Sequence, residues 1–213
     1  MMLINLTKPE LAAIVLAGGN SVRMGCDKAL LAVNGIPLLQ SVCQIAQQCA
    51  NPVYVVTGWA ERYHEIVPSD CQIIPEGESM LSWQPQGPLV GFARGLAQVN
   101  TDWVLVLACD MPRLRADVLQ AAIAQLPNIS PEAIAYLPRQ SNRWEPLCGF
   151  YRRSGLPELQ RFIDTGGRSF QRWLETQTVA ELPLSDPSIL LNCNTPEDLT
   201  TLGLSEEQKG END

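Results

Sequence analysis

Short apolar runs alternate with helix-like segments through the first half of the chain. The runs that lack polar alternation are Ala12–Ala17, Val53–Thr57, Cys71–Ile74 and Trp103–Cys109. A short continuous apolar run is typical of a strand that is buried on both faces of a parallel sheet. The pattern therefore predicts four such strands.

The segments between these runs carry apolar residues at helical spacing. We predict helices over Ile36–Cys49, Leu89–Val99 and Asp117–Leu126. Pro37 suits a first helical turn, where a missing backbone N–H costs nothing. Alternating strands and helices predict an α/β fold with parallel strand pairs and right-handed crossovers.

The second half has more closely spaced elements, which favours some antiparallel pairing. The predicted strands are Ala133–Leu137, Leu147–Arg152, Val179–Leu182 and Ile189–Leu191. The predicted helices are Leu156–Asp164, Ser169–Glu175 and a last one that is capped by Thr195 and begins at Pro196. We expect one doubly wound, three-layer, Rossmann-like domain over residues 1–204, with a mostly parallel, partly mixed sheet. The polar segment 205–213 is predicted to be a disordered tail.

Composition narrows the class of protein. The chain has 213 residues, 46% of them hydrophobic, and a net charge of -8, which suits a globular domain and disfavours binding to nucleic acid or to an anionic membrane. It contains 7 cysteines without a C-x-x-C pair, which disfavours a zinc site and suits reduced thiols. No signal peptide and no membrane-spanning run is recognisable, so we expect a cytoplasmic protein.

The first candidate site is the stretch L-A-G-G-N-S-V-R-M-G-C-D-K, residues 16–28. Glycines after a buried strand allow backbone N–H groups to approach phosphate oxygens, and Arg23 and Lys28 can neutralise a polyphosphate. The spacing matches neither the dinucleotide fingerprint nor the Walker A loop. The alternative is a glycine-rich turn that carries solvated charges.

The second candidate is Asp110, which ends the most strand-like run at the edge where such folds bind ligands. It can hold Mg²⁺ together with substrate phosphates, or it can simply cap the next helix. Asn192 and Asn194 end another predicted strand, and one of their carbonyl oxygens can supply a second metal ligand. The alternative for this pair is a plain helix-capping loop.

Two weaker candidates remain. Gly87, Pro88 and Leu89 open a helix that can face a base or a ribose, although its glycines also suit close packing. The cationic loops Arg139–Glu145 and Gly166–Ser169 can meet a second anionic substrate, or they can be solvated surface. The single histidine, His64, lies in a polar segment, so a mechanism that needs two imidazoles is excluded.

Together these segments resemble the molybdenum cofactor guanylyltransferases, within a wider group of nucleotidyltransferases. The resemblance covers about Ala12 to Leu199. It rests on the stretch described above and, in the family's order, on Q-G-P-L-V-G-F-A-R-G-L, V-L-A-C-D-M-P, E-P-L-C-G-F-Y and N-C-N-T-P-E-D-L.

The resemblance implies a nucleotidyltransferase fold and transfer of GMP from GTP to the terminal phosphate of molybdopterin, with Mg²⁺ as cofactor. Implied partners are GTP, molybdopterin, and molybdoenzymes, their chaperones or other cofactor-biosynthesis proteins. Arg23, Lys28 and Asp110 are the implied catalytic residues, and Asp110 and Asn194, or Asn192, the metal ligands. Implied nucleotide-binding residues are Leu16, Ala17, Gly18, Gly19, Lys28, Thr57, Glu76, Gly87, Pro88, Leu89 and Asp110.

The chain departs from the family pattern at two positions. Thr57 stands where Asn is common, and Glu76 where Asp is common, which puts the base or ribose contacts in question. A related enzyme that uses CTP with molybdopterin, or a nucleotide with a sugar phosphate, stays an alternative. A non-catalytic nucleotide-binding protein is disfavoured by Asp110, and a dinucleotide-dependent oxidoreductase by the glycine spacing.

Overall fold

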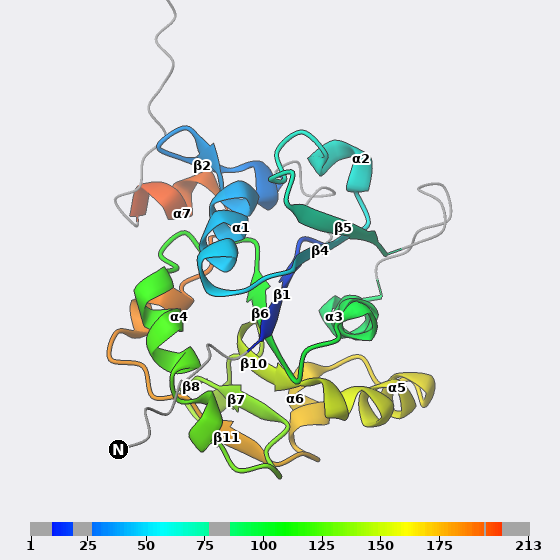
Figure 1. The fold of residues 1–213 in the computed structure, drawn as a ribbon. Helices are drawn as coiled ribbons and strands as arrows, with labels where there is room; N and C mark the ends of the chain where they lie inside the picture. Colours follow the sequence, from blue (N-terminus) through cyan, green and yellow to red (C-terminus); the bar gives the residue numbers. More distant parts are fainter. Residues whose placement is uncertain (1–9, 19–26, 77–85, 194, 202–213) are drawn as a thin grey trace, which may run out of the picture.

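The central sheet has seven strands in the order β11-β7-β10-β6-β1-β4-β5 (Figure 1). This computed structural model describes residues 10–18, 27–76, 86–193 and 195–201. The strands of the sheet are β1 (Leu11–Leu16), β4 (Val53–Thr57), β5 (Cys71–Pro75), β6 (Trp103–Ala108), β7 (Ala135–Leu137), β10 (Cys148–Arg152) and β11 (Val179–Glu181).

Six of these strands run in one direction and β10 runs against them. β1 pairs in parallel with β4 and β6, whereas β10 is antiparallel to both β6 and β7. The reversal is possible because a small hairpin, β8 (Arg139–Gln140) with β9 (Arg143–Trp144), joins β7 to β10 without a crossover helix. The predicted mostly parallel, partly mixed sheet is confirmed.

Helices cover both faces of the sheet and make three layers (Figure 1). α1 (Leu38–Cys49) and α4 (Ala116–Ile123) pack on one face. α3 (Pro88–Gln98), α5 (Leu156–Asp164) and α6 (Phe170–Leu174) pack on the other. The other two α-helices of the described residues are short: α2 (Ala60–Tyr63) and α7 (Pro196–Thr201).

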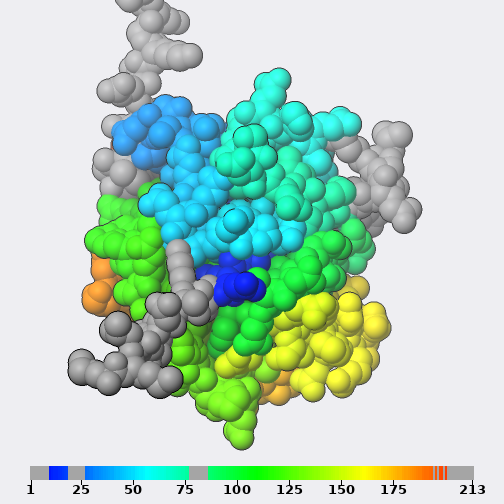
Figure 2. Space-filling model, viewed as in Figure 1, coloured from blue at the N-terminus to red at the C-terminus, as the bar shows by residue number. Residues whose placement is uncertain are grey.

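The strand β1 divides its side chains between the two layers. Ala13 and Val15 belong to the core beneath α1, while Ile14 and Leu16 belong to the core beneath α3. This alternation is the period of two that a strand imposes. The residues of β1 are almost completely buried. In the space-filling view only a small area of the dark-blue segment that contains β1 is visible (Figure 2).

Helix α3 lies unusually close to the sheet. A Cβ atom on Gly95 would be 3.0 Å from Ile14 Cδ1 and 3.0 Å from Val56 Cγ2. The glycine therefore lets the helix backbone approach β1 and β4, as the packing interpretation of this segment expects. The partner is the sheet, however, and not another helix.

One predicted strand is wrong. Ile189–Leu191 does not form a strand, because Pro187–Leu190 is a 3₁₀ helix, η5, whose first turn is capped by Asp186 through a 2.9 Å bond from Ser188 N. Proline also suits the start of a helix better than an internal strand.

Helix α1 begins later than predicted. A 3₁₀ helix η2 (Lys28–Leu30) and a hairpin of β2 (Ala32–Val33) with β3 (Ile36–Pro37) precede it. Asn34 and Gly35 turn this hairpin with positive φ angles of 51° and 75°, as Asn-Gly turns commonly do.

Among the described residues, no helix is both long enough and apolar enough to cross a membrane. The predicted tail 205–213 lies outside the described residues. The single-domain extent 1–204 stays a prediction.

Candidate functional site

A cavity of about 370 Å³ opens where β1 and β6 end. This is the carboxyl edge of the parallel strands, where ligands of such folds bind. Its lining comes from the ends of both strands, η2, α2, the start of α3 and the segment after η5: Leu16, Ala17, Gly18, Asp27, Lys28, Ala29, Tyr63, Pro88, Ala108, Cys109, Asp110, Leu147 and Asn192.

Seven of the predicted site residues line this cavity together: Leu16, Ala17, Gly18, Lys28, Pro88, Asp110 and the alternative metal ligand Asn192. The end of β1 is held by its main chain, since Cys109 N donates to Leu16 O at 3.2 Å and Ala17 N donates to Val56 O at 2.9 Å. Lys28 Nζ lies 3.8 Å from Asp110 Oδ2, so the predicted phosphate-binding cation and the predicted metal ligand face each other.

Asp110 carries a negative charge in a mostly buried position. Its side chain is 18% exposed, and burial raises the pKa of its carboxyl, while the Lys28 charge and a backbone hydrogen bond act in the opposite direction. A carboxylate whose ionised form is under-stabilised in this way gains from a further cation. The environment thus suits a metal ligand better than a helix cap.

The segment after η5 lies against Asp110. Cys193 N donates to Asp110 O at 2.8 Å, and Asn192, which is exposed, lines the cavity beside it. A carboxylate and an amide oxygen in one cavity form a donor set that Mg²⁺ accepts, together with substrate phosphates. Asn194, the other asparagine predicted here, lies outside the described residues.

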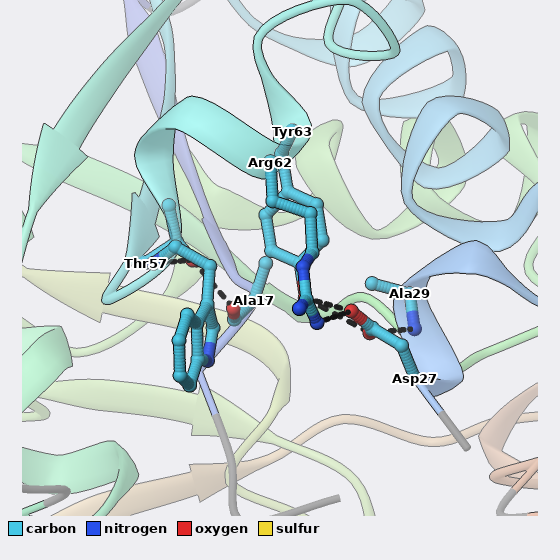
Figure 3. A network of polar contacts seen from close by, with 7 residues as sticks. Ala17, Asp27, Ala29, Thr57, Arg62 and Tyr63 are labelled. Atoms are coloured by element: carbon cyan, nitrogen blue, oxygen red, sulfur yellow. Dashed lines mark hydrogen bonds and ion pairs between the residues drawn. The ribbon is translucent and has the colours of Figure 1, made fainter. Parts of the chain in front are cut away.

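Lys28 begins η2, and the preceding residue fixes that helix. Asp27 caps η2 by accepting from Ala29 N at 3.2 Å. The Asp27 carboxylate also accepts hydrogen bonds from the Tyr63 hydroxyl at 2.9 and 3.0 Å and pairs with Arg62 at 3.0 Å (Figure 3). These contacts fix the start of η2, and with it the position from which the Lys28 side chain enters the cavity.

Two predicted nucleotide contacts have no exposed surface. Thr57 and Leu89 are both 0% exposed. The Thr57 hydroxyl donates to Ala17 O at 2.8 Å and accepts from Trp59 N at 3.0 Å, while Leu89 packs in the core beneath α3. In the described structure the Thr57 hydroxyl supports Ala17, which lines the cavity. A nucleotide contact by either residue stays a prediction.

Glu76 lies beside two glycines of the site. A Cβ on Gly18 would be 2.7 Å from Glu76 Oε1, and a Cβ on Gly91 would be 2.5 Å from the same oxygen. The absence of side chains at both positions makes room for the carboxylate between the end of β1 and α3. A nucleotide contact by Glu76 stays a prediction.

Gly87 starts α3 with a backbone shape that favours glycine. Its φ is +87°, and Pro88 follows at the first helical position. The position of a Cβ on Gly87 is 4.0 Å from Arg168 O, which brings the predicted cationic loop Gly166–Ser169 next to this helix start. A nucleotide contact by Gly87 stays a prediction.

The other cationic loop forms the β8–β9 hairpin. Arg139 stacks over the Trp144 ring at 5.0 Å and donates to Asn142 Oδ1 at 2.6 Å, contacts that order the hairpin itself. Its role toward a second substrate stays a prediction. Gly19 and Arg23, predicted for nucleotide binding and catalysis, lie outside the described residues.

Six lining residues were not predicted as site residues: Asp27, Ala29, Tyr63, Ala108, Cys109 and Leu147. All but Tyr63 lie in, or directly after, the motifs G-C-D-K, A-C-D-M-P and E-P-L-C, so the sequence pointed to their neighbourhood. Tyr63 carried no such signal, because its contact with Asp27 joins segments that are far apart in the sequence.

Neither thiol nor imidazole chemistry is supported at this site. Burial, with the charges of Asp110 and Asp27, raises the pKa of the Cys109 thiol, which keeps it neutral and unreactive. His64, the one histidine of the chain, lines a different cavity with Pro68 and Cys71. The arrangement instead offers a carboxylate, an ammonium group and a glycine turn, which suit phosphate groups.

Comparisons with known proteins agree with this geometry. Residues 13–180 match the family model described as "MobA-like NTP transferase domain". A "Probable molybdenum cofactor guanylyltransferase" of Trichormus variabilis is 58% identical over 91% of this chain and 90% of its own length. A protein of the same name from Synechococcus elongatus is 43% identical over 91% and 98%.

A solved structure shares the fold. The molybdopterin-guanine dinucleotide biosynthesis protein A of Archaeoglobus fulgidus superposes with a TM-score of 0.71 at 24% identity, over 89% of this chain and 95% of that one. The family match spans most of the chain and includes Asp27, Lys28 and Asp110. This chain therefore belongs to the family of MobA-like NTP transferases.

Proposed function

We propose that this protein is a nucleotidyltransferase that transfers GMP from GTP to the terminal phosphate of molybdopterin, giving molybdopterin guanine dinucleotide and pyrophosphate. The observation that carries the proposal is the cavity in which Gly18, Lys28 and Asp110 meet. The relatives named molybdenum cofactor guanylyltransferase support the choice of GTP and molybdopterin as substrates.

The reaction needs little proton chemistry. A terminal phosphate oxygen of the acceptor forms a bond to the α-phosphorus of GTP, and the bond from that phosphorus to the α,β-bridging oxygen breaks. The electron pair leaves with pyrophosphate. Because the attacking phosphate is already ionised, no general base is required, which agrees with a cavity whose described lining contains no histidine.

The residues of the chain contribute positioning and charge. Lys28 would neutralise the triphosphate and the charge that accumulates on the leaving pyrophosphate. The position of its ammonium group in the cavity, 3.8 Å from Asp110, supports this role. The backbone at Ala17 and Gly18 approaches the nucleotide where no bulky side chain intervenes. Buried groups that are held before the reaction need not reorganise during it.

Asp110 would hold a divalent cation, with Mg²⁺ as the ion that best suits its oxygen donors, and Asn192, whose amide lines the same cavity, would join it. When bound, such an ion supplies charge stabilisation to phosphate oxygens. The raised pKa of Asp110 indicates that the carboxyl is poorly compensated without a cation. Asn194 and Arg23 keep their proposed places as metal ligand and catalytic cation.

Glu76 is the proposed contact to the base or ribose. A carboxylate only accepts hydrogen bonds when ionised, which suits the N1–H and N2–H donors of guanine or the ribose hydroxyls. Its place beside Gly18, a residue that lines the cavity, supports this assignment. We further propose that the protein works in the cytoplasm and passes its product to molybdoenzymes, directly or through their chaperones.

The decisive experiment compares GTP, CTP and UTP with molybdopterin and Mg²⁺ under identical conditions and measures pyrophosphate release together with the dinucleotide product. We expect GTP to be turned over fastest by a wide margin. Preferred use of CTP would assign the protein to cytidylyl transfer. A parallel reaction replaces molybdopterin with a sugar 1-phosphate, and turnover only with that acceptor would remove molybdopterin from the proposal.

A further inference from the structure

One segment, Thr57–Tyr63, is bonded to both ends of the predicted phosphate loop (Figure 3). At the first end, Thr57 Oγ1 donates to Ala17 O at 2.8 Å. At the second end, the Tyr63 hydroxyl contacts both carboxylate oxygens of Asp27, at 2.9 and 3.0 Å. The end of β4 and helix α2 thus fix the two residues between which that loop runs.

Asp27 is held from three directions. Besides Tyr63, it accepts from Arg62 Nη1 at 3.0 Å and from Ala29 N at 3.2 Å. The bond from Ala29 N caps η2, the helix that begins at Lys28. The orientation of the Asp27 carboxylate therefore sets the direction in which the Lys28 side chain leaves the backbone.

Tyr63 is the more strongly enclosed of the two side chains that reach Asp27 from α2. It is 2% exposed, whereas the side chain of Arg62 is 39% exposed. Burial, followed by the negative charge of Asp27, raises the pKa of the Tyr63 hydroxyl, so that it stays protonated and donates. A solvated ion pair fixes geometry weakly, while a buried charge-assisted hydrogen bond fixes it well.

We infer that Tyr63 is a positioning residue for Lys28, which it acts on through Asp27. The tyrosine hydroxyl fixes the carboxylate that caps η2, and the capped helix holds the Lys28 ammonium group 3.8 Å from Asp110. This inference rests on the proposed function in one respect, namely that Lys28 meets the triphosphate. Thr57 does the equivalent for Ala17 at the other end of the loop.

The test removes one oxygen atom. Tyr63→Phe keeps the ring in the core and deletes the hydroxyl, and Tyr54→Phe is the matched control, because the Tyr54 hydroxyl lies 3.4 Å from Gln98 O and away from the cavity lining. We expect kcat with GTP to fall about tenfold in Tyr63→Phe, the size expected for one lost hydrogen bond to a charged group. KM for GTP should change less, and Tyr54→Phe should match the unaltered protein.

A second readout needs no turnover. The chain has only three lysines, Lys8, Lys28 and Lys209, so ¹³C-dimethylation gives a simple NMR spectrum. The Lys28 signal is the one that disappears in Lys28→Arg. In the absence of nucleotide it should shift in Tyr63→Phe and stay in place in Tyr54→Phe, whereas loss of stability alone would not move it in the folded protein.

The outcomes separate the inference from the function on which it rests. If Lys28→Ala retains full turnover of GTP, the proposed role of Lys28 is wrong. If Lys28→Ala is inactive while a folded Tyr63→Phe keeps its kcat and its Lys28 signal, only the positioning role is overturned. Should Tyr63→Phe not fold, Asp27→Asn takes its place, and an unmoved Lys28 signal there overturns the inference equally.

Discussion

The ammonium group of Lys28 lies 3.8 Å from the carboxylate of Asp110, although the two residues follow different strands of the sheet. The adjacent, parallel strands β1 and β6 deliver them to the same edge. The pair is not a strong structural ion pair, because a partly exposed contact at this distance contributes little to folding. Under the proposed function, the pair instead holds opposite charges ready for a polyphosphate and a cation.

Asp110→Asn should abolish most activity and stabilise the metal-free fold. The folded-state pKa of Asp110 lies above its ordinary value of 3.8, so the carboxyl holds its proton more tightly when folded. Stability is therefore lost as the pH rises through the folded-state pKa, and at neutral pH the charge is a net cost. Asparagine removes that cost, while turnover falls by about a hundredfold or more as the cation loses its ligand.

Thermal unfolding of both proteins at pH 7 without metal measures this effect. The difference in Tm should shrink as the pH is lowered toward the range in which Asp110 is protonated. A lower Tm for Asp110→Asn at neutral pH would show that the carboxylate is well compensated in the folded state.

Lys28→Ala should lower kcat by about a hundredfold and change the free energy of unfolding by less than about 0.5 kcal/mol. The Lys28 charge lowers the pKa of Asp110, so its removal raises that pKa further. The acidic limb of the pH–rate profile should then move to higher pH, because protons compete with the cation for the carboxylate. Arg115→Ala, which breaks an exposed ion pair with Asp117, is the charge-matched control and should leave the profile in place.

The two asparagines proposed as metal ligands, Asn192 and Asn194, make separate predictions. Asn192 lines the cavity with Asp110, so Asn192→Ala should raise the Mg²⁺ concentration needed for half-maximal rate about tenfold. Asn194→Ala, measured alongside, shows whether the second asparagine shares the role. Asn128, an exposed asparagine that ends the 3₁₀ helix η3 (Leu126–Asn128) and does not line the cavity, provides the control substitution, and its replacement should not alter the metal dependence.

Gly91→Ala and Gly95→Ala form a matched pair on α3. The new Cβ at position 91 would lie 2.5 Å from the end of the Glu76 side chain, which can move away, so nucleotide use should suffer more than stability. At position 95 it would lie 3.0 Å from two buried methyl groups, so unfolding should become easier by about 1–3 kcal/mol.

The readouts are KM for GTP and urea-induced unfolding. Gly91→Ala should raise KM for GTP, whereas Gly95→Ala should leave it unchanged in the protein that remains folded. Comparing GTP with ITP, which lacks the N2 amino group, separates a base contact from a ribose contact. The reverse pattern, a KM effect at 95 and none at 91, would exclude Glu76 from the nucleotide site.

Much of the architecture can be predicted from the sequence, because buried parallel strands consist of short, continuous runs of apolar residues. Ala12–Ala17, Val53–Thr57 and Trp103–Cys109 were placed within a residue of β1, β4 and β6. Since parallel strands end at one edge, Lys28 and Asp110 could be expected to converge there. The strand prediction for Ile189–Leu191 is wrong, because a run of three apolar residues is as compatible with a 3₁₀ helix as with a strand.

Side-chain contacts between distant segments were not predictable. The family resemblance implies a nucleotide contact for Thr57, but it gives no sign that the Thr57 hydroxyl bonds to Ala17 O. No sequence pattern predicts the hydrogen bond between Tyr63 and Asp27, since that contact depends on how α2 packs relative to η2. Such contacts follow from the packed structure and not from local periodicity.

The hydrogen bond from Cys193 to Asp110 has a consequence for synthesis of the chain. The last strand of the sheet, β11, ends at Glu181, so every strand can leave the ribosome before Asn192 and Cys193 do. The edge around Asp110 therefore gains its final neighbours late in synthesis. The same segment brings Ile189 and Leu190 into the core beneath α1, so the step that completes the edge around Asp110 also completes that core.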